Sequence, residues 1–208
     1  GLKQGPARQA MRQAGLPDST GATTINKLCG SGMKATMFAF DSIVAGTNDI
    51  VLAGGMESMT NAPYVLDKAR AGLRMGHGQV YDHMFLDGLE DAETGRLMGS
   101  FAQEVADKRS ITREDMDNYA IESLKRAQTA IAEGWFKDEI TPVTVQTRKG
   151  EVVVDTDEQP GNANIDKIPT LRPAFAKDGT VTAANASSIS DGASALVLAR
   201  ESVASERG

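Results

Sequence analysis

Apolar residues along this chain recur mainly with the period of a helix. Four segments either repeat apolar residues every three or four positions or consist of good helix formers: residues 6–14, 33–45, 97–108 and 112–133. Thr112 can cap the longest of these helices, with Asp115 reaching back to it, and Gly134 ends that helix. The segment 33–45 is apolar on nearly all sides, which predicts a helix buried between layers.

Shorter apolar runs predict strands between these helices. Residues 23–25 are β-branched, residues 49–55 form an apolar run with a glycine exit, and residues 195–199 predict a further buried strand. Residues 143–154 alternate on either side of a polar turn, which predicts a hairpin. A strand on each side of the helix at 33–45 predicts a βαβ unit with a parallel sheet. The predicted fold class is therefore α/β.

Composition narrows the class of protein. The 208 residues are 40% hydrophobic and 24% charged, which is ordinary for a globular protein and too apolar for a disordered chain. The formal net charge of −6 argues against nucleic acid or an anionic membrane as the main partner. No apolar run reaches ~18 residues and residues 1–14 do not resemble a signal peptide, so no membrane segment is expected. The single cysteine excludes an internal disulfide and favours a reducing, cytoplasmic location.

Cys29 is the candidate for chemistry, because it stands where the strand at 23–25 ends and the apolar helix begins. A helix N-terminus carries unpaired N–H groups and roughly +0.5 of an elementary charge, which favours the thiolate, the reactive form of cysteine. Gly30 and Gly32 let a bound group approach the backbone, and the amides of this turn could stabilise a thioester oxyanion. The alternative is that this lone cysteine is a small buried hydrophobic residue.

Residues 26–35, NKLCGSGMKA, closely resemble the nucleophile segment of the thiolases, the acetyl-CoA acetyltransferase family. Six further segments resemble thiolase segments in the order of that family: residues 1–10, 53–59, 97–99, 171–175, 180–187 and 191–193. Chance does not produce so many motifs in one order. The resemblance implies the thiolase-like layered α/β/α fold, N-terminal half only, with an inserted mixed α+β loop domain.

The resemblance also implies residue roles by position. Cys29 would take the acyl group from a thioester, with its own N–H in the oxyanion hole, and Met98 would shape a short acyl pocket. Six residues would line the tunnel for the pantetheine arm of coenzyme A: Leu89, Phe175, Ala183, Ala186, Ser187 and Ile189. Ser187 would hydrogen-bond an amide of that arm. The implied reaction is condensation of two acetyl-CoA molecules or reverse thiolysis of a 3-ketoacyl-CoA, with coenzyme A as substrate or product and no permanent cofactor or metal.

The sequence departs from the thiolase pattern in its catalytic partners. The family uses a histidine in a G-H-P segment, a second cysteine in a C-x-G-G-G segment and an N-E-A-F segment, and none of these occurs here. His77 and His83 lie in the irregular stretch 60–95 and match no catalytic motif.

We therefore interpret the chain as an internal fragment without the opening strand and the C-terminal domain of the family. Three parts are expected: an incomplete N-terminal domain at 1–58, a loop domain for CoA binding and oligomerisation at 59–189, and a return to the N-terminal domain at 190–208.

Two other functions stay open. Residues 30–35 match the dinucleotide fingerprint G-x-G-x-x-A. That fingerprint needs an acidic residue at the end of the following strand, whereas Asp49 stands at the beginning of it. The other function is non-catalytic: a chain that binds coenzyme A or associates with copies of itself, since a dimer or tetramer is expected for the parent protein. Arg148 and Lys149 could contact the phosphates of coenzyme A, but a solvated hairpin turn also explains them.

Overall fold

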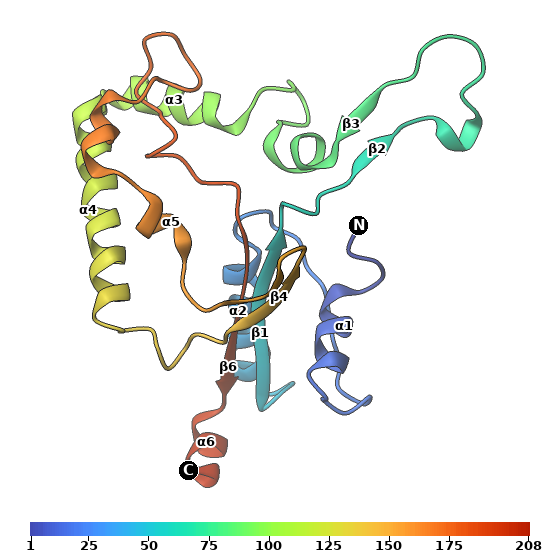
Figure 1. Cartoon of the computed structure of the whole chain (residues 1–208). Coiled ribbons are helices and arrows are strands. Elements are labelled where there is room, and N and C mark those ends of the chain that lie inside the picture. The colour runs from blue at the N-terminus through green and yellow to red at the C-terminus, as the bar shows by residue number, and fades with distance from the viewer. The chain divides into compact units, whose positions relative to one another are not determined.

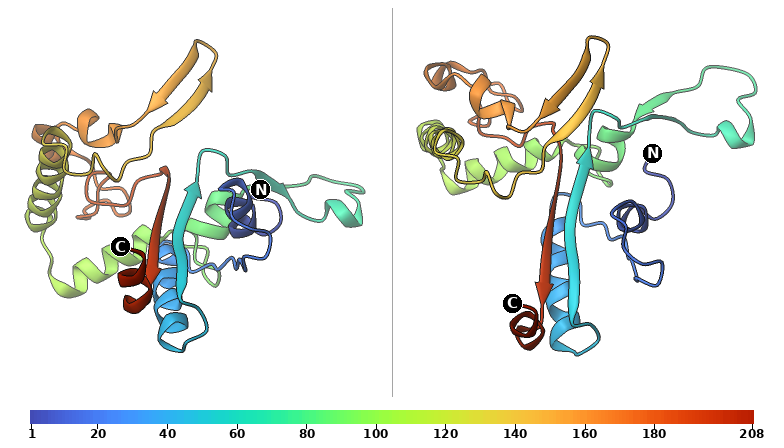
Figure 2. Two further views of the ribbon diagram at one scale, coloured as in Figure 1. Left: turned by 90° about the horizontal axis from the view of Figure 1, so that it is seen from below. Right: turned by 60° about the horizontal axis from the view of Figure 1, so that its bottom comes forward.

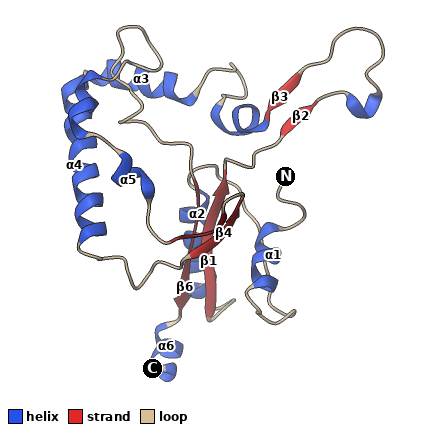
Figure 3. Ribbon diagram, viewed as in Figure 1, coloured by secondary structure: helices blue, strands red, loops and turns tan.

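The computed structural model describes residues 1–208, which form two compact units. The first unit comprises Gly1–Ala92 and Ile189–Gly208, and the second comprises Glu93–Ser188. Helices and strands alternate with long connecting segments in both units (Figure 3). The second unit lies within the predicted loop domain, whose boundaries at 59–189 stay a prediction.

The centre of the first unit is a pair of antiparallel strands. Strand β1 (Ile50–Ser58) pairs with β6 (Asp191–Ala199) over the full length of both. Helix α2 (Ser31–Val44) packs along one face of this pair, as Figure 1 and both views of Figure 2 show. A Cβ atom at Gly55 would lie 3.3 Å from the Cα of Gly32, so helix and strand meet at backbone distance. Glycine at both positions therefore allows the start of α2 to lie against β1.

The remaining elements of the first unit are short. They are α1 (Pro6–Gln13), β2 (Tyr64–Leu66), the 3-10 helix η1 (Ala69–Ala71), β3 (Val80–Asp82), the π-helix η2 (Phe85–Leu89) and α6 (Glu201–Arg207). Strands β2 and β3 pair antiparallel. The helix expected at residues 6–14 is confirmed by α1, whereas α6 was not predicted.

The second unit contains two long helices and a hairpin. Its elements are α3 (Met98–Arg109), α4 (Arg113–Ala132), β4 (Val143–Thr147), β5 (Gly150–Val154), α5 (Glu158–Asn162) and the 3-10 helix η3 (Ile165–Thr170). The predicted capping of α4 is confirmed, because Thr112 and Asp115 form a reciprocal capping box. The antiparallel pairing of β4 with β5 confirms the predicted hairpin. None of the helices in the chain combines the length and the apolar composition needed to cross a membrane.

The structure corrects the predicted sheet. No strand forms at residues 23–25, so there is no strand–helix–strand unit around α2, and β1 pairs antiparallel with β6. The prediction of a parallel sheet from these segments was therefore wrong, although the α/β class is confirmed. The physical reason is that an apolar run indicates a strand but does not identify its partner, which here lies far along the chain.

The structure also corrects the predicted burial. Within α2 only Ala39 is buried, and Met33, Phe40 and Val44 are exposed, so this helix is not covered on all sides. Strand β6 is likewise exposed over most of its length. The reason is that the helix covers only one face of the strand pair, and the strand pair covers only one side of the helix. The buried apolar residues are mostly small: Met11, Ala39, Ala53, Ala106, Ala130, Ile168 and Val181.

Candidate functional site

Cys29 lies on the turn that leads into α2. Gly30 is the N-cap residue of that helix, so the cysteine directly precedes the helix start, as the sequence predicts. The side chain is a free thiol and is exposed to solvent. The alternative of a buried, purely structural cysteine is therefore wrong. The predicted strand at residues 23–25 is absent, and the chain has no regular structure there before the turn at residues 27–30.

Two side chains fix the backbone of this turn. The Oγ of Ser31 accepts a hydrogen bond from the N–H of Lys27 at 2.9 Å and donates one to the carbonyl of Leu28 at 2.7 Å. The Oδ1 of Asn26 accepts from the N–H of Leu28 at 2.8 Å. Leu28 adopts a left-handed conformation with φ of 50°, which is uncommon for a residue other than glycine. Residues in such conformations persist only where the surrounding structure holds them, and they are frequent at active sites, ligand clamps and switch regions.

The same turn uses some of the amides that were expected to face a ligand. The N–H of Gly30 donates to the carbonyl of Lys27, and the N–H of Ser31 donates to the carbonyl of Leu28, both at 3.0 Å. These two N–H groups are therefore not free to bind an oxyanion. The involvement of Cys29's own N–H in an oxyanion hole stays a prediction.

An apolar hollow in the first unit lies at the other end of α2. Its lining includes Phe40, Val44 and Leu198, at the C-terminal part of the helix. A helix of 14 residues is about 20 Å long, so this hollow is too far from Cys29 to hold a group that the thiol attacks. A group bound in this hollow could therefore not reach the thiol of Cys29.

The structure divides the predicted coenzyme A residues between the two units. The first unit contains Leu89, half-buried at the end of η2, and Ile189, which is exposed. The second unit contains Met98, Phe175, Ala183, Ala186 and Ser187. The role of these residues in binding coenzyme A stays a prediction.

Within the second unit, Phe175 lies beside the start of α3. Met98 is the first residue of that helix, and Gly99 follows it. A Cβ atom at Gly99 would be 2.1 Å from the Phe175 ring, so the ring lies directly on the Gly99 backbone. Two of the predicted residues therefore lie at the first turn of α3: Met98 belongs to it, and the ring of Phe175 packs against it.

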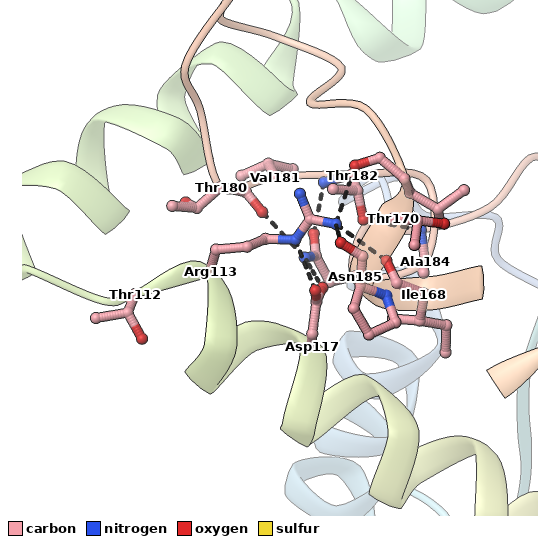
Figure 4. Close-up of polar contacts among 12 residues, drawn as sticks. Thr112, Arg113, Asp117, Ile168, Thr170, Thr180, Val181, Thr182, Ala184 and Asn185 are labelled. Atoms are coloured by element: carbon pink, nitrogen blue, oxygen red, sulfur yellow. Dashed lines mark hydrogen bonds and ion pairs between the residues drawn. The ribbon is translucent and has the colours of Figure 1, made fainter. Parts of the chain in front are cut away.

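The segment 180–187, which resembles the pantetheine-binding strip, is held by buried and half-buried polar side chains that the sequence analysis missed. These side chains belong to Gln103, Arg113, Asp117 and Asn185, and Figure 4 shows the last three in contact. Only the spacing of Arg113 and Asp117, four residues apart on one helix, could have indicated a pair from the sequence. Nothing in the local pattern indicates their long-range contacts.

The histidines and the dinucleotide motif contribute little to this site. His83 begins the short helical turn before η2 and pairs with Asp87 at 3.2 Å, both side chains being exposed, which corrects its assignment to a loop. The dinucleotide fingerprint needs a strand before residues 30–35, and no strand is present there. Asp49 instead accepts from the Arg200 side chain at 2.8 Å. The structure therefore contradicts the dinucleotide-binding alternative.

Two carboxyl groups in the chain have altered acidity, and both are structural. Hydrogen bonds from the hydroxyl and then the backbone N–H of Thr112 lower the pKa of Asp115 below its ordinary value. The Thr60 N–H, which donates to Asp191 at 2.9 Å, lowers the pKa of that carboxyl in the same way.

No group of three or more His, Cys, Asp or Glu side chains is arranged to hold a metal ion.

Comparison with known proteins gives a consistent family. The model of the thiolase N-terminal domain matches residues 1–202. A mitochondrial acetyl-CoA acetyltransferase of Gibberella zeae is 48% identical over 99% of this chain and 48% of its own length. An acetyl-CoA acetyltransferase of Pseudomonas aeruginosa is 49% identical over 95% of this chain and 51% of its own length. The chain thus spans about half the length of the curated relatives it matches.

Solved structures agree with the sequence relatives. An acetyl-CoA acetyltransferase from Syntrophomonas wolfei superposes with a TM-score of 0.91 at 42% identity, over 100% of this chain and 52% of that one. A thiolase from Ascaris suum, solved in complex with coenzyme A, superposes with a TM-score of 0.90 at 42% identity, over 100% of this chain and 53% of that one. The fold is therefore that of the N-terminal half of these proteins.

Proposed function

Because the chain belongs to the thiolase family, we propose that it carries the nucleophile of an acyl-CoA C-acyltransferase, with Cys29 as the residue that accepts the acyl group. The observation that carries this proposal is the exposed thiol of Cys29 on a fixed turn at the N-terminus of α2. Relatives that are named acetyl-CoA acetyltransferases support the same class of reaction.

The proposed first step is transfer of an acyl group to sulfur. The thiolate of Cys29 attacks the carbonyl carbon of an acyl-CoA, and a carbon–sulfur bond forms to the protein while a negative charge develops on the oxygen. The bond to the sulfur of coenzyme A then breaks, and coenzyme A leaves as a thiolate that takes up a proton. The product is an acyl-enzyme thioester on Cys29. A second acyl-CoA, having lost a proton from its α-carbon, attacks this thioester: a carbon–carbon bond forms, the bond to the sulfur of Cys29 breaks, and the 3-ketoacyl-CoA and the Cys29 thiolate are released.

We propose that the segment 180–187 binds the pantetheine arm of the substrate. Ala183 and Ser187 are exposed and Ala186 is half-buried, so small side chains leave room for the arm while the Ser187 hydroxyl can bond one of its amides. The Ascaris suum structure contains coenzyme A, which supports a ligand of this kind in the fold. Arg148 and Lys149 form the exposed turn of the β4–β5 hairpin, and contact with the phosphates stays a prediction for them.

Both steps need groups that this chain does not contain. Neither a G-H-P nor a C-x-G-G-G segment is present, so this chain lacks the catalytic histidine and the second cysteine of the family, and His77 and His83 match no catalytic motif. We propose that these groups belong to the part of the thiolase relatives that the chain does not span. The chain by itself would then form the acyl-enzyme slowly or only bind coenzyme A, which is the alternative function.

The test is intact-mass measurement after incubation with acetyl-CoA. We expect the mass of one acetyl group to be added to the wild-type chain and to be absent from Cys29→Ala. The control is Ser123→Ala, an exposed position on α4 without a hydrogen bond of its side chain, which should acquire the acetyl group like the wild type. Iodoacetamide labelling measures in parallel whether the thiol is accessible.

The outcomes separate the two functions. An adduct that depends on Cys29 supports acyl transfer by this residue. No adduct, with coenzyme A still bound and Cys29 still labelled by iodoacetamide, would favour the binding function over acyl transfer. An adduct that persists in Cys29→Ala would contradict the assignment of the nucleophile.

Assembly and location are proposals of the same kind. We propose that the whole protein is a homo-oligomer, a dimer or tetramer, and its mass in solution tests this. A cytoplasmic location stays a prediction from the sequence, and we propose a role in fatty acid metabolism from the family resemblance. The Gibberella zeae relative is named as mitochondrial, so fractionation of cells is the measurement that decides between compartments.

A further inference from the structure

Two polar side chains of the second unit are almost completely buried and take no part in the proposed chemistry. Gln103 on α3 is 5% exposed and Asp117 on α4 is 4% exposed. A buried carboxylate or amide is costly unless each of its polar atoms has a partner. Both side chains have such partners, and both connect to the segment 180–187. This shared target suggests a purpose beyond the stability of either helix.

Asp117 links α4 to this segment through two partners. Its Oδ2 accepts a hydrogen bond from Nε of Arg113 at 2.7 Å, and its Oδ1 accepts one from Nδ2 of Asn185 at 3.3 Å (Figure 4). Arg113 in turn donates to the carbonyls of Ile168 and Leu171, both at 3.0 Å. The carboxylate is thus compensated by one charged and one neutral donor, as a buried charge requires.

The side chain of Asn185 also forms hydrogen bonds with the backbone of its own segment. Its Nδ2 also donates to the carbonyl of Thr180 at 3.1 Å, and its Oδ1 accepts from the N–H of Thr182 at 2.7 Å. One side chain therefore fixes two backbone groups of the segment and connects them to Asp117. Thr182 is completely buried beside it.

Gln103 holds the start of the same segment. Its Oε1 accepts from the N–H of Thr180 at 2.9 Å and from the N–H of Val181 at 3.0 Å. Its Nε2 donates to Asp107 at 2.9 Å, which fixes the orientation of the amide. Two helices therefore hold residues 180–185 from independent points, although the segment itself contains no helix or strand.

The residues of this segment that are anchored by hydrogen bonds differ in exposure from the residues that we propose contact the ligand. The anchored residues Val181 and Thr182 are buried, whereas Ala183 and Ser187 are exposed. A ligand-binding loop that is ordered in advance loses less conformational entropy when it binds, which increases affinity. We propose that Asp117 and Asn185 are positioning residues, which hold the segment 180–187 in the conformation that binds the pantetheine arm. This inference rests on the proposed function of that segment.

The test exchanges donors and acceptors within the pair. Asn185→Asp keeps an acceptor for Thr182 but removes the donor to Asp117 and places two carboxylates together. Asp117→Asn keeps the shape and one acceptor oxygen, but its amide nitrogen must face a donor of Arg113 or Asn185, so we expect a smaller loss of the same kind. The double exchange Asp117→Asn with Asn185→Asp restores one donor–acceptor pair. The control is Asn118→Asp, the same chemical change at an exposed neighbour on α4 with no side-chain hydrogen bond.

Two quantities are measured on the full chain: the dissociation constant of coenzyme A, and hydrogen exchange of the amides of residues 180–187. We expect Asn185→Asp to weaken binding about tenfold or more and to accelerate exchange of these amides, with the double exchange recovering part of both. Asn118→Asp should leave both unchanged. The far-UV circular dichroism spectrum checks that every variant keeps its helices.

The outcomes distinguish this inference from the proposed function. If the wild-type chain binds no coenzyme A, the proposed function fails, whereas exchange still reports whether the pair holds the segment. If the wild type binds and Asn185→Asp binds equally well, or if Asn118→Asp weakens binding as much, the positioning role is wrong. Should Asn185→Asp fail to fold, Asp117→Asn decides: unchanged affinity and unchanged exchange in that variant would overturn the inference.

Discussion

At Gly99 the second unit leaves no space for a side chain. The Phe175 ring carbons would lie between 2.1 and 2.4 Å from a Cβ atom at this position. Since those carbons are the far end of a side chain that can rotate, a methyl group would displace the ring and not the backbone. The close contact therefore fixes where Phe175 lies relative to the first turn of α3.

We predict that Gly99→Ala destabilises the chain by roughly 1–2 kcal/mol, because the overpacking cost exceeds the gain in helix propensity. Gly161→Ala is the matched control, since nothing lies within 4 Å of a Cβ atom there, and we expect it to be neutral or stabilising. The midpoint of urea unfolding measures both. Combining Gly99→Ala with Phe175→Leu should recover part of the loss. A Gly99→Ala variant as stable as the wild type would show that the ring does not depend on this contact.

Asp191 gives a prediction about pH. Its pKa is lowered in the folded chain by the hydrogen bond from the Thr60 N–H, so the carboxylate stabilises the folded state fully above the ordinary value of about 3.9. That contribution disappears as the pH falls through the lowered pKa. We therefore expect Asp191→Asn to unfold at lower urea concentration than wild type at pH 7, with a difference that narrows in acid.

The control for this pH dependence is Asp41→Asn, an exposed carboxylate on α2 without a side-chain hydrogen bond or ion pair. Its difference from wild type should be small at every pH. A difference for Asp191→Asn that grows as the pH falls would have the wrong sign and would contradict the role of the Thr60 hydrogen bond.

At the scale of elements, the capping box of α4 is a local stabilising device. The N–H of Asp115 donates to Oγ1 of Thr112 at 3.1 Å, and the Thr112 N–H donates to the Asp115 carboxylate at 3.2 Å. We predict that Thr112→Ala destabilises the chain by about 1 kcal/mol, because an orphan N–H of the first turn loses its acceptor. Ser123→Ala, exposed in the middle of the same helix, should be neutral or slightly stabilising. Thermal unfolding compares the two, and equal melting temperatures would contradict the prediction.

Elements with local signals could be predicted from the sequence. The helix expected at 112–133 is observed as Arg113–Ala132, because its cap and its terminating glycine act within a few residues. The hairpin at 143–154 was predicted for the same reason, since a polar turn determines which strands pair. Helix α6 (Glu201–Arg207) was missed, as it is short and polar and has no apolar stripe.

Long-range pairing could not be predicted in the same way. The sequence indicated β1 and part of β6 as strands. The backbone hydrogen bonds of a strand do not depend on which strand it pairs with, so the sequence does not identify the partner, and the expected parallel arrangement was wrong. The candidate site shows the same limit. Cys29 was placed at a helix start from its neighbours, whereas the contacts of Asp117 and Gln103 with the segment 180–187 join residues more than 60 apart in the chain.

At the scale of the whole molecule, the face of the β1–β6 pair that points away from α2 is uncovered. Since Gly55 faces α2, the residues one position away in β1 and their partners in β6 point to the opposite face. That face carries Leu52, Met56 and Val197, all exposed, and both strands also have an unpaired edge. Exposed apolar surface beside free strand edges promotes association between copies of a protein.

We predict that the chain associates with itself as its concentration rises, and that Val197→Lys reduces this association. Val197 is 71% exposed, so a lysine there costs little folded-state packing while its charge opposes contact between two such faces. Sedimentation velocity over a range of concentrations measures the effect. Tyr119→Lys is the matched control, because it introduces the same charge at an exposed residue on α4. Equal association of the two variants would show that copies meet through another surface, whereas a selective loss in Val197→Lys identifies the open strand face as the point of contact.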